Sequence, residues 1–151
     1  ALDALTTSID SIEIQAPVEH FTHTDYYEKE MGSDLSRTFV LFGSLKNRES
    51  LADIKLATNA IEQALAIGSK RVVNLDPGYI ALEHVILATT KGFSHRVYLR
   101  DGIYADLTLV FNDGTYRALQ WTYPDYAEAR TILLFNDWRG HYKKVMKCRR
   151  A

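Results

Sequence analysis

Three basic or titratable side chains, Lys91, His95 and Arg96, stand close together in the chain. Acidic side chains are available on both sides of them, at Asp76 upstream and Asp106 downstream. A histidine next to a carboxylate can act as a general acid or base, and lysine and arginine side chains bind anionic groups. These residues therefore predict a site for an anionic, phosphorylated small molecule, with hydrolytic or acid–base chemistry.

The predicted catalytic residues are Lys91, His95, Asp106 and Asp76. The predicted ligand-binding residues are polar or aromatic: Asn74, Tyr79, Arg96, Tyr104 and Tyr27. The titratable residues also have ordinary structural roles to weigh against a site. Asp76 can cap a helix, Asp106 can balance an arginine or lysine across a sheet, and His95 can be a hydrogen-bonded core residue.

A β-hairpin is predicted to position the centre of this site. Two strand-like segments, residues 94–100 and 103–111, flank the dipeptide Asp101-Gly102, which is typical of a two-residue turn. A second turn signal, Asn112-Asp113-Gly114, leads into residues 115–121. The sequence therefore predicts an antiparallel meander of three strands.

The register of the first hairpin decides which side chains meet. A two-residue turn places Val97 opposite Asp106 and His95 opposite Thr108, with Arg96 on the other face. The face that carries His95 is then predicted to hold His95, Tyr104, Asp106 and Thr108. The side chains expected to converge on one pocket are Lys91, His95, Asp106 and Tyr104, with Asp76 or Tyr79 at its rim.

A divalent metal ion is the one cofactor that the residue spacing suggests. His20, His23 and Asp25 form a pattern that can hold zinc or a similar ion. Three potential ligands in a local loop are common by chance, so surface histidines are the more ordinary interpretation.

The other elements are predicted from hydrophobic spacing and capping residues. Strands are expected at residues 8–15, 37–42 and 71–75. A helix is expected from Asn47 or Ser50 to Gly68, with an inward stripe of Leu51, Ile54, Thr58, Ile61 and Leu65.

After the third strand, Asp76-Pro77 favours a helix start, and residues 85–88 are assigned to a helix. A long terminal helix carries a stripe of Ile132, Phe135, Trp138, Tyr142 and Val145. The predicted fold class is α+β, with a mixed sheet, a C-terminal antiparallel meander and two long packing helices. Residues 1–151 are expected to form a single domain.

The composition excludes several classes of protein. The 151 residues are 46% hydrophobic and 25% charged, as in an ordinary globular protein, and the net charge of −1 offers no general attraction for nucleic acid or an anionic membrane. No apolar run is long enough to cross a bilayer. Cys148 is the only cysteine, which excludes an intrachain disulfide and makes the reducing cytoplasm the simplest location.

Long stretches of the chain resemble a bacterial and archaeal family catalogued as domain of unknown function 4416. The resemblance rests on residues 24–32, 74–79, 88–91, 94–99 and 121–126. It implies that a strand and a helix precede the first strand seen here, so the chain is expected to lack a natural N-terminal portion. Some family members are labelled as GTP-binding, but this sequence has no G-x-x-x-x-G-K-[ST] loop.

Two other functions stay open beside the anion site. The protein could be a nucleotide- or RNA-binding module that stacks bases on its tyrosines and tryptophans, or a protein-interaction domain without catalysis. Buried carboxylates around one pocket would favour the anion site. Exposed aromatic residues on an open sheet would favour the nucleotide- or RNA-binding module. A large apolar patch without a cleft would favour the protein-interaction domain.

Overall fold

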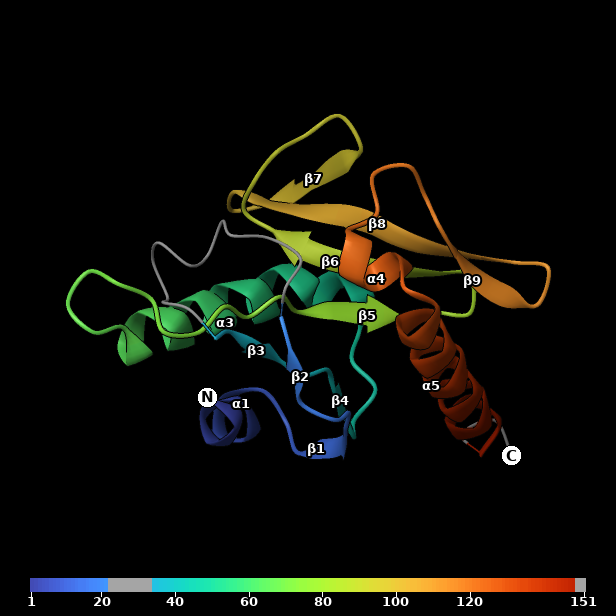
Figure 1. Ribbon diagram of the computed structural model, residues 1–151, viewed down its shortest axis with the longest axis horizontal. Coiled ribbons are helices and arrows are strands. Elements are labelled where there is room, and N and C mark those ends of the chain that lie inside the picture. Colours follow the sequence, from blue (N-terminus) through green and yellow to red (C-terminus); the bar gives the residue numbers. More distant parts are fainter. Residues whose placement is uncertain (22–33, 149–151) are drawn as a thin grey trace. The chain divides into compact units, whose positions relative to one another are not determined.

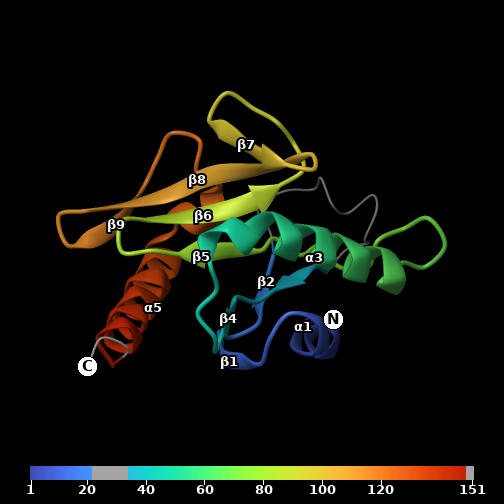
Figure 2. The same cartoon turned by 180° about the vertical axis from the view of Figure 1, so that it is seen from behind.

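The computed structural model describes residues 1–21 and 34–148, and its contacts divide the chain into two compact units, Ala1–Asp76 and Pro77–Ala151 (Figures 1 and 2). Helices and antiparallel sheets occur together, which confirms the predicted α+β class and the C-terminal antiparallel meander. The sheet is not mixed as predicted, because the strand pairings of the described residues are all antiparallel.

The first unit contains two small sheets and a long helix. Its elements are α1 (Leu2–Ser8), β1 (Ile12–Gln15), β2 (Glu19–His20), β3 (Ser36–Arg37), β4 (Val40–Phe42), the 3-10 helix η1 (Arg48–Ser50) and α3 (Leu51–Leu65). β1 pairs with β4, and β2 pairs with β3. The predicted strand at residues 37–42 is thus divided between two sheets.

Helix α3 buries the apolar stripe that its spacing predicts. Leu51 and Ile61 are buried, and Ile54 and Leu65 are half-buried. Thr58, the polar member of the stripe, donates its hydroxyl to the carbonyl of Lys55 at 3.0 Å. This bond to the preceding turn is the structural role expected for a core threonine in a helix.

Residues 71–75 do not form the predicted strand, because two side chains of α3 form hydrogen bonds with the backbone of Leu75. The Lys55 ammonium donates to the Leu75 carbonyl at 2.7 Å, and the Glu62 carboxylate accepts the Leu75 amide at 2.6 Å. Both α3 side chains are buried. Because these side chains already form hydrogen bonds with the N–H and C=O groups of Leu75, the residue does not require pairing with a neighbouring strand.

The predicted helix cap at Asp76 is also wrong, because the residues that follow Pro77 begin strand β5 (Gly78–Ile80). The Asp76 carboxylate instead accepts a hydrogen bond from Asn74 Nδ2 at 2.6 Å and lies 3.6 Å from the Lys55 ammonium. Pro77 suits the start of a strand, and its carbonyl accepts the amide of Ala88 at 2.8 Å.

Asp10 joins two turns of the first unit. Its carboxylate accepts the amides of Ser11 at 2.8 Å and Ser44 at 3.2 Å, and the Lys46 ammonium lies 3.3 Å away. A hydrogen bond from the Ser44 side chain is the main cause that lowers the pKa of Asp10 from 3.8 to about 2, with Ser11 and Lys46 contributing further.

This pKa predicts a pH-dependent contribution to stability. Because the folded pKa is below the unfolded value, the unfolded chain binds more protons, so the stabilisation is present above about pH 4 and is lost as the pH falls through about 2. Urea unfolding of the wild type and of Asp10→Asn between pH 5 and pH 2 measures it. The stability difference between the two proteins is expected to shrink as the pH falls. A difference that stays constant over this range would contradict the assignment.

The second unit is a five-stranded antiparallel sheet with two helices. Its elements after β5 are β6 (His84–Thr89), β7 (Arg96–Arg100), β8 (Ile103–Asn112), β9 (Thr115–Ala118), α4 (Pro124–Ala127) and α5 (Ala129–Cys148). β6 lies between β5 and β8, and β7 and β9 share the other edge of β8 (Figure 1). β7 pairs with the first part of β8 and β9 with its last part.

Residues 85–88, assigned to a helix from the sequence, belong to strand β6. All of them are buried, as in a central strand covered on both faces. A continuous apolar run has neither helical nor strand periodicity, so the sequence pattern could not distinguish the two.

Helix α5 forms where predicted and packs against β5 and β9. Phe135 and Trp138 from its predicted stripe are buried. On β9, the buried Tyr116 donates its hydroxyl to the Ala81 carbonyl at 2.5 Å, and its amide donates to the Asn136 side chain of α5 at 2.9 Å. The contact with Asn136 attaches the helix to the sheet that carries the candidate site.

The predicted turn at Asp101-Gly102 is confirmed, but the predicted register beyond it is wrong. Both turn residues have positive φ, and Arg100 lies opposite Ile103, as a two-residue turn requires. Leu99 is then an extra residue on β7, a β-bulge that shifts the remaining pairs by one position. Consequently Arg96, and not Val97, lies opposite Asp106.

A second irregularity lies on the other side of Asp106. Val85 of β6 pairs with Leu109, but the next residue, Ile86, pairs with Leu107, so Thr108 is the extra residue on β8. Thr108 is fully buried. Bulges redirect side chains and are frequent next to functional sites. Asp106 therefore lies between two such irregularities.

Candidate functional site

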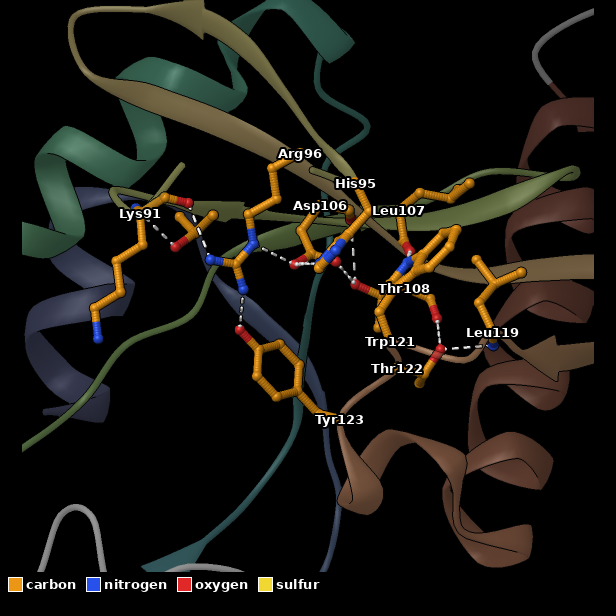
Figure 3. Close-up of polar contacts among 11 residues, drawn as sticks. Lys91, His95, Arg96, Asp106, Leu107, Thr108, Leu119, Trp121, Thr122 and Tyr123 are labelled. Atoms are coloured by element: carbon orange, nitrogen blue, oxygen red, sulfur yellow. Dashed lines mark hydrogen bonds and ion pairs between the residues drawn. The ribbon is translucent and has the colours of Figure 1, made fainter. Parts of the chain in front are cut away.

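The Asp106 carboxylate is the centre of the cluster drawn in Figure 3. Its Oδ2 accepts a hydrogen bond from Arg96 Nε at 2.8 Å, and its Oδ1 lies 3.4 Å from the Thr108 hydroxyl. Only 3% of the Asp106 side chain and 11% of the Arg96 side chain are exposed. A charge at this depth requires a partner, and the bulge at Leu99 places Arg96 where it provides one.

Arg96 connects three segments of the second unit. Besides its bond to Asp106 on β8, it donates from Nη1 to the Lys91 carbonyl at 3.0 Å and from Nη2 to the Tyr123 hydroxyl at 2.7 Å. Guanidinium carries five N–H donors in a rigid plane, so these three bonds fix its orientation and leave further donors.

His95 reaches Asp106 from the turn before β7 and not from a position on the strand. The turn is closed by a hydrogen bond from the Arg96 amide to the Phe93 carbonyl at 3.1 Å. His95 Nε2 lies 3.4 Å from Asp106 Oδ2, but the oxygen is outside the direction that a hydrogen bond requires. Among the described residues, this Nε2 is the one buried side-chain nitrogen or oxygen without a hydrogen-bond partner.

Aromatic rings hold the His95 ring in place. Trp121 stacks on it almost in parallel, with the ring centroids 5.0 Å apart and the planes inclined by 11°. Phe93 contacts it at a tilt, with centroids 5.3 Å apart. These contacts leave 10% of the His95 side chain exposed. The imidazole is therefore fixed by packing, while its buried nitrogen is left without a hydrogen bond.

The loop after β9 completes the site by filling a gap along β8. β7 pairs with β8 as far as Asp106, and β9 pairs with it from Leu109 onward. In the gap, Trp121 Nε1 donates to the Leu107 carbonyl at 2.8 Å, and the Thr122 hydroxyl donates to the Thr108 carbonyl at 2.6 Å. The loop thus satisfies two strand carbonyls and positions Trp121 against His95.

The sequence did not predict Trp121, Thr122 and Tyr123 as site residues. The available signal was a polar and aromatic run directly after the last strand, ending at Pro124. This run reaches the site because it fills the gap between β7 and β9 along β8. No local sequence pattern indicates that gap.

Lys91, predicted as catalytic, contributes its backbone carbonyl and not its ammonium to the cluster. Its side chain is exposed and extends away from His95 and Asp106 (Figure 3). The predicted convergence of the Lys91 ammonium on this pair is therefore wrong. Lys91 is still connected to the cluster, because its backbone carbonyl accepts the hydrogen bond from Arg96.

The predicted binding tyrosines of the second unit lie on different strands. Tyr104 is on β8, with Tyr98 edge-on against it and Gly92 so close that a Cβ there would lie 3.1 Å from the Tyr104 ring. Tyr79 is on β5, and its hydroxyl lies 3.5 Å from His84 Nε2.

The remaining predicted residues belong to other parts of the chain. Asn74 and Asp76 lie in the first unit, where they bond to each other. His20 lies in β2 opposite Ser36. Three residues fall outside the described part of the chain: His23, Asp25 and Tyr27. Within residues 1–21 and 34–148 no group of three or more potential metal ligands is present.

The buried charges of the cluster form a compensated pair. The negative charge of Asp106 is balanced by the positive charge of Arg96, and Lys91 on the neighbouring turn is exposed. His95 adds an imidazole beside the Asp106 carboxylate, an arrangement typical of general acid–base catalysis.

The family model described as Domain of unknown function (DUF4416) matches residues 1–142, so the chain belongs to this family. No curated protein and no solved structure matches the chain. In the part of the chain that the structure describes, no helix is both long and apolar enough to span a membrane.

Proposed function

We propose that this member of the DUF4416 family binds an anionic small molecule at His95, with His95 as the group that exchanges a proton with the ligand. The observation that carries the proposal is the buried His95 Nε2, which has no hydrogen-bond partner although a carboxylate lies 3.4 Å away. An unsatisfied buried nitrogen is costly, and native proteins retain such groups mainly where a ligand, a water or a reaction uses them.

The surrounding charges support an anion as the ligand. The buried Asp106 is already paired with Arg96, so it does not repel an incoming negative charge as a lone carboxylate would. Arg96 keeps N–H donors beyond the three that are engaged. These donors can bond to phosphate or carboxylate oxygens.

The arrangement of the ring supports proton exchange. Trp121 and Phe93 fix the plane of the imidazole, and Asp106 lies beside its Nε2. A protonated His95 would form an ion pair with Asp106 through Nε2. A histidine oriented by a carboxylate is a common general acid or base.

Titration of the full chain with inorganic phosphate, followed by two-dimensional ¹H–¹⁵N NMR, tests the proposal. The signals of the Trp121 indole and the Arg96 guanidinium are expected to shift and to saturate. His95→Ala is expected to weaken phosphate binding about tenfold to a hundredfold, because it removes a hydrogen bond to a charged group.

His141→Ala is the matched control, because it removes a histidine from α5 in the same unit. It is expected to bind phosphate as the wild type does. Equal affinities of the wild type and His95→Ala, or no saturable shift at all, would contradict the proposal.

A further inference from the structure

We infer that the anion bound at His95 carries a planar aromatic group, and that Phe93 is the residue that selects it. The inference rests on the proposed function, since it concerns the ligand of the same site. Phe93 leaves 68% of its surface exposed, although its ring lies against His95. An exposed phenylalanine at a polar site is unusual, because a ring of this size is normally buried.

A second exposed ring lies on the strand that carries Arg96. Arg96 and Tyr98 are two positions apart on β7 and lie opposite Asp106 and Tyr104, so the four side chains share one face of the sheet. Tyr98 is 58% exposed and meets Tyr104 edge-on. The Arg96–Asp106 pair therefore has the Tyr98–Tyr104 pair beside it on that face, and Phe93 lies against the neighbouring His95.

The exposure of His95 explains why Phe93 should meet the ligand. Trp121 covers one face of the imidazole and Phe93 packs at a tilt, so only 10% of the side chain is open. Because the Phe93 ring contacts the imidazole, a group that binds the open part of His95 is expected to come close to Phe93. A ligand with a planar ring would gain a ring–ring contact there, while a bare inorganic anion would leave Phe93 exposed.

Binding of phenyl phosphate and methyl phosphate to the full chain, followed by the Trp121 indole signal in NMR, tests the inference. Both compounds carry a phosphate monoester, and they differ in the ring. The wild type is expected to bind phenyl phosphate about tenfold more tightly, which is the effect of one aromatic contact. Phe93→Ala is expected to remove this preference, because it lowers the affinity for phenyl phosphate more than the affinity for methyl phosphate.

Leu133→Ala provides a matched control, because Leu133 is an equally exposed apolar residue, at 68%, on α5 of the same unit. It is expected to keep the full preference for phenyl phosphate. Equal affinities of the two compounds for the wild type, with binding still dependent on His95, would overturn the inference and leave the proposed function standing. An equal loss of both affinities in Phe93→Ala would also overturn it, and no binding of either compound would overturn both.

Discussion

Asp106→Ala is expected to lower the free energy of unfolding by about 3–5 kcal/mol, the cost of leaving one member of a buried ion pair without its partner. The Arg96 side chain is 11% exposed and its guanidinium loses its partner at 2.8 Å, while water cannot readily replace the carboxylate. The Thr108 hydroxyl loses a neighbouring acceptor as well. Urea unfolding at neutral pH measures the change.

A double-mutant cycle separates the ion pair from the general effect of truncation. In Asp106→Ala combined with Arg96→Leu, no buried charge is left unpaired, so the double variant is expected to be more stable than the sum of the single effects predicts. Arg117→Ala is the control, because its pair with Asp113 is exposed and should change stability by no more than about 0.5 kcal/mol. Strict additivity in the cycle would show that the two side chains do not act as a pair.

The hairpin that holds Asp106 shows how far the sequence could predict the site. Asp101-Gly102 has the residue types that a turn with positive φ demands, so the turn could be predicted. The bulge at Leu99 could not, because leucine fits a regular strand as well as a bulged one. This one extra residue shifts the register, so that Arg96 lies opposite Asp106 in place of the predicted Val97. The contact of His95 with Asp106 was expected from a shared strand face, but it arises from the turn before the strand.

The errors at residues 71–88 have a different physical cause. The apolar residues among 71–75 favour a strand, but Leu75 donates its amide to Glu62 and accepts a hydrogen bond from Lys55, and it lies outside any sheet. Those partners are distant in sequence and are charged side chains on a helix, so no local pattern indicates them. Asp76-Pro77 carries the signal of a helix start, whereas the tertiary pairing of β5 with β6 determines the outcome.

Gly78→Ala is expected to destabilise the protein by about 2–3 kcal/mol, through a clash with the backbone of the neighbouring strand. Gly78 lies opposite Leu87 in the pairing of β5 with β6. A Cβ at this position would lie 2.4 Å from the Ile86 carbonyl oxygen and 2.7 Å from Leu87 Cδ2. The carbonyl belongs to a central strand and cannot move aside as a flexible side chain would, so β5 has to shift. Urea unfolding measures the loss.

Gly140→Ala tests whether that loss comes from the close approach and not from the loss of glycine as such. Gly140 lies within α5 of the same unit, and apart from the backbone of its own helix a Cβ there would meet no described atom within 4 Å. Alanine favours a helix interior over glycine by about 1 kcal/mol, so this variant is expected to be more stable than the wild type. The same substitution should therefore change stability in opposite directions at the two positions. If Gly78→Ala matched the wild type, the close packing of β5 on β6 would be wrong, and with it the sheet order that places β8 and Asp106.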